Sequence, residues 1–143
     1  MPDEEPIEPI GGYLTCGTVG TGLIGAPTMT YKLLVPIAGT GPVSGQVQIT
    51  QPVHPPVTIW IEGLHGSIHH FLPPFGTVVK LEGTYLHSLP PPAIGEIVLH
   101  FSAILNVNVK GGMWTGYGSF TYGGHTVDNA KVKGHPCILD KTE

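Results

Sequence analysis

The chain has 143 residues, a formal net charge of −4 and a charged fraction of only 11%. Six lysines and arginines in total cannot neutralise many phosphates, so we expect no nucleic acid as a partner. No run of eighteen apolar residues is present, which argues against a transmembrane helix, and 41% apolar residues fit one globular domain.

The first twelve residues form an acidic, proline-rich segment, MPDEEPIEPIGG, that we expect to be a disordered arm. This segment lacks the basic and apolar regions of a secretory signal, so the sequence as written predicts a cytoplasmic protein. A mature secreted form stays open as the alternative. Residues 13–137 are predicted to form a single β domain, and residues 138–143 a tail.

Short apolar runs separated by glycine and proline fill the predicted domain. Within most of them, apolar and polar residues alternate, which places them on opposite faces of a strand. The glycines and prolines fall between the runs, where turns need them. The predicted strands are residues 13–19, 28–35, 43–50, 57–71, 77–86, 96–110, 113–122 and 125–133.

Residues 96–110 are the longest run without glycine or proline, and the other strands are predicted to be arranged around them. Ile97, Phe101 and Leu105 belong to one alternating face, whereas the other face is mostly polar. The run ends in Asn-Val-Asn-Val, which is a poor helix former. We therefore predict a central, half-buried antiparallel strand.

These patterns predict an all-β fold with no significant helix. About eight mostly antiparallel strands, each paired with its sequence neighbour, would form a meander. A meander of this size closes as a β-sandwich or as an up-and-down β-barrel, and both remain open.

Three histidines, His65, His69 and His70, are the candidate metal ligands. Glycines 63 and 66 suggest a bulge or bend in this strand, with His65 and His69 on the face of Ile61. Histidines four apart on a straight strand lie about 13 Å apart, too far to share one ion unless the backbone bends. Ordinary exposed histidines are the competing interpretation.

Aromatic residues are the candidate ligand-binding set, because they could form a platform for a sugar or an apolar ligand. Packing in the sheet core is the competing interpretation. The set consists of Trp60, Trp114, Tyr117, Phe120 and Tyr122, together with His100 on the polar face of the central strand.

Two cysteines, Cys16 and Cys137, lie near opposite ends of the chain. We expect two independent reduced thiols. A disulfide between the first strand and the end of the domain is the alternative in an oxidising environment.

The first half of the chain resembles a family of small bacterial β domains of unknown function. The resemblance rests on Gly-Ala-Pro-Thr (25–28), the apolar strand at 33–35, the Gly-Gln-Val-Gln-Ile-Thr-Gln strand end (45–51) and Pro-Pro (55–56). It implies a self-contained β domain and no particular activity, cofactor or site residue.

No nucleophile motif or phosphate loop is present, so we expect no catalytic residue and no cofactor. A surface so poor in charge is typical of a protein that hides part of itself against a partner. We therefore predict a non-enzymatic binding or self-assembly module that forms a homo-oligomer. The alternatives are a barrel that carries a small apolar or aromatic ligand and a metal-dependent enzyme that uses the histidine cluster.

Overall fold

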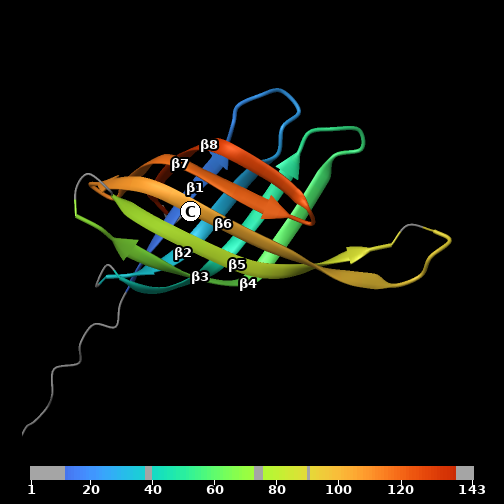
Figure 1. Cartoon of the computed structure of the whole chain (residues 1–143), viewed down its shortest axis with the longest axis horizontal. Helices are drawn as coiled ribbons and strands as arrows, with labels where there is room; N and C mark the ends of the chain where they lie inside the picture. Colours follow the sequence, from blue (N-terminus) through green and yellow to red (C-terminus); the bar gives the residue numbers. More distant parts are fainter. Residues whose placement is uncertain (1–11, 38–39, 73–75, 90, 138–143) are drawn as a thin grey trace, which may run out of the picture.

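Eight antiparallel strands form a closed up-and-down barrel in the computed structural model of the protein (Figure 1). The structure describes residues 12–37, 40–72, 76–89 and 91–137. The acidic N-terminal segment that was predicted to be disordered, apart from Gly12, and the predicted C-terminal tail therefore lie outside the described residues. The all-β meander is confirmed, and it closes as a barrel. The strands are β1 (Gly12–Gly20), β2 (Thr28–Pro36), β3 (Gly41–Gln51), β4 (Val57–His70), β5 (Thr77–Ser88), β6 (Glu96–Lys110), β7 (Met113–Tyr122) and β8 (His125–Pro136).

Each strand pairs with its neighbours in sequence, and β1 pairs with β8 to close the ring. The described residues contain no helix long and apolar enough to cross a membrane.

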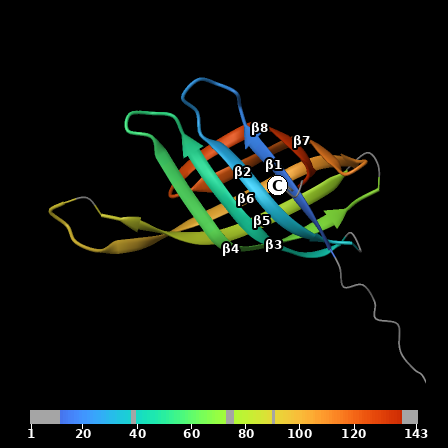
Figure 2. The same ribbon diagram turned by 180° about the vertical axis from the view of Figure 1, so that it is seen from behind.

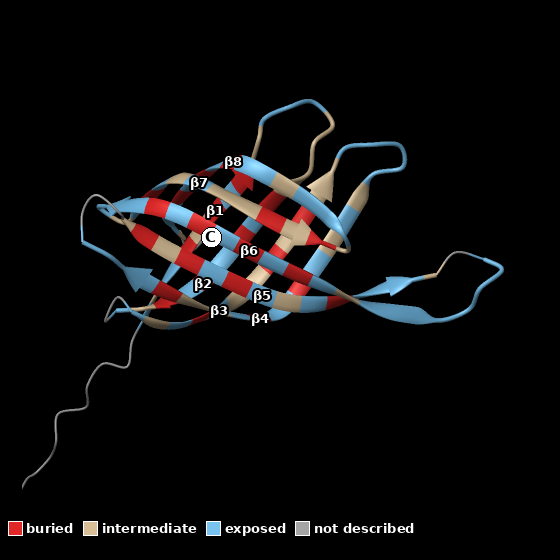
Figure 3. Cartoon of the chain, in the orientation of Figure 1, coloured by how far each residue is buried: buried red, intermediate tan, exposed pale blue. Residues whose placement is uncertain are grey.

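The barrel centre is filled by the inward-facing side chains of all eight strands. Buried and exposed residues alternate along the strands, as the banding in Figure 3 shows. In β6, Phe101, Ala103, Leu105 and Val107 are buried while the residues between them are exposed, as their alternation predicts. Burial of each large apolar side chain contributes about 1.5–3 kcal/mol, so this packed interior is the main source of stability.

A β-bulge in β4 reverses the face to which its side chains point. Ile61 and Leu64 are both buried, although strict alternation would place them on opposite faces. The pairing with β3 shifts at this point, and Gly63 has a φ of 69°, a conformation that glycine adopts without strain. The predicted bulge is therefore confirmed, but the predicted placement of His65 on the face of Ile61 is wrong.

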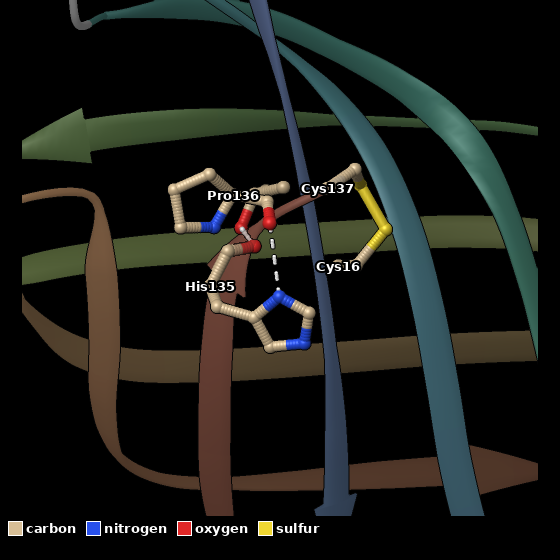
Figure 4. Close-up of a disulfide and its surroundings, with 5 residues drawn as sticks. Cys16, His135, Pro136 and Cys137 are labelled. Carbon is tan, nitrogen blue, oxygen red and sulfur yellow. Dashed lines mark hydrogen bonds between the residues drawn. A yellow bond between two sulfur atoms is a disulfide. The ribbon is translucent and has the colours of Figure 1, made fainter. Parts of the chain in front are cut away.

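A disulfide fastens the seam between β1 and β8. The sulfur atoms of Cys16 and Cys137 are bonded, and the Cα atoms lie 5.1 Å apart (Figure 4). The backbone N–H of Cys137 donates to the carbonyl oxygen of Leu14 at 3.1 Å, which prolongs the ladder past the end of β8. The expectation of two independent thiols is thus wrong, because barrel closure brings the two ends of the domain side by side.

Candidate functional site

The β5–β6 hairpin extends beyond the barrel as a two-stranded arm. We define the arm as residues 83–88 of β5, residues 96–101 of β6 and the described loop residues 89 and 91–95 between them. Figures 1 and 2 show it projecting from one end of the barrel in both views. Four aliphatic side chains on it are solvent-exposed, by 63% at Leu86, 95% at Ile94, 42% at Ile97 and 57% at Val98.

The arm leaves an open notch between β4 and β5. These strands pair only between residues 65–70 and 77–82. Beyond that stretch, residues 57–64 of β4 pair with β3, and residues 83–88 of β5 pair with β6. Within the described residues, each strand therefore has one edge without a strand partner. A cleft of about 620 Å³, lined by Gln46, Trp60, Glu62 and Thr84, lies at this notch.

The backbone groups of β5 that face the notch follow from the hydrogen bonds at its two ends. The N–H of Phe71 donates to the carbonyl oxygen of Gly76 at 2.9 Å, so Gly76 faces β4. The N–H of Leu89 donates to the carbonyl oxygen of Gly95 at 3.0 Å, so Leu89 faces β6. Because successive residues of a strand point their backbone groups to opposite sides, the even-numbered residues of β5 face β4.

The N–H and C=O groups of Thr84, Leu86 and Ser88 therefore point into the notch. A hydrogen bond made by β6 gives the same orientation for the backbone groups of Thr84. The carbonyl oxygen of His100, the partner of Thr84 on β6, accepts from the N–H of Gly123 at 3.2 Å and so points away from β5. An exposed strand edge of this kind is a template for the addition of another strand.

Large apolar side chains line both edges of the notch. Trp60, on the outer face of β4, is 53% exposed, and Leu86 projects from the arm. Only Glu62, Glu82 and Glu96 bring a formal negative charge to this region, and no lysine or arginine lies within residues 81–109. The surface thus offers two large apolar side chains and free backbone groups, beside the polar side chains of Gln46, Glu62 and Thr84 that line the cleft.

The predicted aromatic set is divided between the two faces of the barrel. Trp114, Phe120 and Tyr122 are buried in the core, where the rings of Phe120 and Tyr122 lie 6.1 Å apart. Tyr117 and His100 are exposed on the outer face, and Trp60 lines the notch. The six residues therefore do not converge on one site.

The predicted metal ligands do not meet either. His65 and His69 point outward from β4, and His65 Nε2 lies 3.9 Å from the Glu82 carboxylate in an exposed contact. His70 lies at the opposite face, with its Nδ1 2.6 Å from the Thr77 hydroxyl. No group of three or more metal-ligating side chains occurs among the residues that the structure describes. An extended strand separates these imidazoles, as its rise per residue requires.

Among the residues that the structure describes, two side-chain polar atoms are buried without a hydrogen-bond partner, Tyr31 Oη and Trp114 Nε1. Their rings pack with centroids 5.8 Å apart. The nearby Thr15 hydroxyl donates instead to the carbonyl oxygen of His135 at 3.4 Å. Burial raises the pKa of Tyr31 well above its usual range, since the tyrosinate would lose its water.

A second outer cleft lies at the end of the barrel where the β1–β2 and β3–β4 loops meet. The Gln51 side-chain amide donates to the carbonyl oxygen of Gly25 at 3.1 Å and joins the two loops. The cleft has a volume of about 600 Å³, and Leu23, Ile24 and Pro56 are among its lining residues.

Sequence reasoning missed the arm and the notch. The signal in the sequence was the pair Ile97 and Val98, two adjacent apolar residues that cannot both face one core. The length of the run 96–110 was a second signal, because about 50 Å of strand exceeds what a small barrel can cover.

Comparison with protein families finds a match over most of the chain. A family model described as Domain of unknown function (DUF1842) matches residues 10–126, well beyond the hairpin that carried the resemblance. A search of the curated proteins finds no match to the chain.

Proposed function

The chain belongs to this family of unknown function, and we propose that it is a non-enzymatic binding module whose contact surface is the β5–β6 arm with the adjoining notch. The observation that carries the proposal is the arm itself. It exposes Leu86, Ile94, Ile97 and Val98 in a stretch that lies beyond the packed centre of the barrel.

Such an arm gains little free energy from standing alone in water. An isolated two-stranded hairpin is marginally stable, and its apolar side chains gain free energy only when something covers them. A contact with another surface would supply that cover. The low charge of the region favours a partner that binds through apolar side chains and backbone hydrogen bonds.

The proposal is tested by shortening the arm without disturbing the barrel. Tyr85 and Leu99 are register partners and form a hydrogen-bonded pair, so an Asn-Gly turn that replaces residues 86–98 would close a two-residue hairpin. We expect the shortened protein to keep its β-sheet circular dichroism and to lose association, measured by light scattering and by pull-down with the tagged full chain.

A matched control keeps the length of the arm and replaces Glu96 by Gln, which leaves its apolar side chains in place. This control should associate as the unmodified protein does. The proposal is wrong if the shortened and full-length chains associate to the same extent, with themselves and with every protein that the full chain captures.

We also propose that the module works in an oxidising environment, in line with the alternative of a secreted mature form. The disulfide across the barrel seam supports this, because such bonds persist mainly outside reducing compartments. Alkylation of free thiols followed by mass spectrometry of protein from its native source should find both cysteines protected. Two alkylated cysteines would contradict the proposal.

A second candidate function is binding of a small apolar ligand, and the outer cleft between the β1–β2 and β3–β4 loops favours it. A carried ligand would occupy this cleft, because side chains fill the centre of the barrel. Native mass spectrometry should detect a co-purified apolar molecule that is lost when Ile24 is replaced by Asp. Ligand-free spectra from several preparations would contradict the idea.

A further inference from the structure

We infer that the arm's partner is a second copy of this chain, and that the β5 edge of each copy adds to the β4 edge of the other. This inference rests on the proposed function of the arm and names its partner. The result would be a two-fold symmetric dimer in which two intermolecular antiparallel ladders fill both notches.

The two free edges suit each other because they belong to strands that already pair. β4 and β5 run antiparallel over residues 65–70 and 77–82. Continued past the bulge, with a shift of one residue for the residue that the bulge adds to β4, this register places Trp60 opposite Leu86 and Thr58 opposite Ser88. Trp60 and Leu86 are both more than half exposed in the single chain. Cross-strand pairing would therefore cover one apolar side chain with another.

In the same register, a buried residue of β4 also lies opposite a buried residue of β5. Ile61 and Tyr85, which lie opposite each other in this register, are both buried, whereas at the neighbouring pair Ile59 is half-buried and His87 is exposed. A shift by one residue would place apolar side chains opposite the wrong face. Side-chain direction therefore supports one register for the intermolecular ladder.

Symmetry favours a second copy over an unrelated protein. One chain provides both a free β4 edge and a free β5 edge, and a two-fold axis satisfies both in each copy. An unrelated strand would satisfy only one of them. The exposed side chains of Trp60, Leu86, Ile94, Ile97 and Val98 give each copy apolar surface near these edges that a second copy can cover.

The β4 strand of the same chain does not pair with the free edge of β5. The β4–β5 ladder ends at the pair His65 and Glu82, two residues from the bulge at Gly63. Within one chain the two edges are thus held apart, whereas a second copy can approach each of them from outside.

Cross-linking of two differently tagged variants tests the arrangement. Thr58→Cys and Ser88→Cys are prepared separately, so that a disulfide between positions 58 and 88 can form only between copies. After mixing and oxidation with oxidised glutathione, we expect a covalent dimer that carries both tags. Thr18→Cys, on the outer face of β1, replaces Ser88→Cys in the control and should give at most a tenth of that yield.

Two proline variants test the role of the β5 edge. Leu86→Pro removes an N–H that points into the notch, whereas Val98→Pro removes one from the opposite edge of the arm, at the register partner of Leu86. Both lose an exposed aliphatic side chain. We expect Leu86→Pro to raise the dimer dissociation constant at least tenfold and Val98→Pro to change it less than threefold.

The possible outcomes separate this inference from the proposed function. A full chain that stays monomeric at high concentration, or equal effects of the two proline variants, would overturn the dimer. Loss of a heterologous complex on arm shortening, with no 58–88 cross-link, would leave the arm as a contact surface and remove the second copy as its partner.

Discussion

Tyr31 shows how a single buried side chain shapes this barrel. Its ring fills the core beside Trp114, while its hydroxyl group has no hydrogen-bond partner among the described residues. A buried, unsatisfied hydroxyl costs about 1–3 kcal/mol. We therefore expect Tyr31→Phe to keep or raise the free energy of unfolding, measured by urea denaturation. A loss of more than about 1 kcal/mol would contradict this and indicate that the hydroxyl binds a buried water.

The raised pKa of Tyr31 leads us to expect a loss of stability at alkaline pH. The pKa of Tyr31 in the folded protein lies above the value of about 10 in the unfolded chain. Folding therefore favours the protonated form, and this contribution is fully present below pH 10 and is lost as the pH rises above 10. Burial also raises the pKa values of Tyr85 and Tyr122. Unfolding curves between pH 8 and 11 should show a decline that Tyr31→Phe reduces; an unchanged decline would exclude Tyr31 as a contributor.

Gly134 leaves the space that the Tyr31 hydroxyl occupies. A methyl group at this position would overlap Tyr31 Oη and lie 3.0 Å from Cβ of Trp114. We expect Gly134→Ala to lower the free energy of unfolding by about 1–3 kcal/mol. In the Tyr31→Phe background the loss should be smaller, because the hydroxyl is gone. Thr18→Ala, on the outer face, is the control, and equal losses in both backgrounds would refute the contact.

At the scale of elements, the β1–β8 seam is the contact that makes a sheet into a barrel. The disulfide spans 121 residues of sequence, so it restricts most of the unfolded chain. A loop of this length corresponds to a stabilisation of about 5 kcal/mol in the chain-entropy model. Replacing both cysteines by Ser should lower the midpoint of chemical denaturation strongly, with the β-sheet circular dichroism retained. An unchanged midpoint would show that strand pairing alone holds the seam.

The elements themselves were predictable because side-chain alternation is a local property. Residues 96–110 and 113–122 match β6 and β7 at both ends, since glycines bound both of them. The choice between barrel and sandwich was not predictable, because it depends on whether β1 meets β8 across the whole chain. The pairing of Cys16 with Cys137 depends on the same long-range contact.

The candidate site was predicted less well than the fold. The face of His65 depends on a bulge that inserts one residue into β4, and a one-residue shift exchanges the two faces of a strand. Trp114 and Phe120 satisfied the pattern of a ligand platform and of a core equally well. Only their neighbours in space, among them Tyr31 and Tyr122, place them in the core.

At the scale of the whole molecule, a packed barrel carries an arm whose outer part, beyond Tyr85 and Leu99, its own core does not cover. The centre is filled by side chains, whereas the clefts at Trp60 and at Leu23 lie on the outside. We therefore expect the function of this molecule to depend on its surface and its strand edges. The region that projects farthest, with free backbone groups on β5, is where we expect recognition to occur.

Hydrogen exchange of the β5 amides at two protein concentrations tests this account most directly. The amides of Tyr85 and His87 bond to β6 and should be protected in dilute and in concentrated solution. The amides of Thr84 and Leu86 point into the notch, so they should exchange rapidly in dilute protein and become protected as the concentration rises. Rapid exchange at Thr84 and Leu86 at every concentration, alone and with any captured partner, would contradict the account.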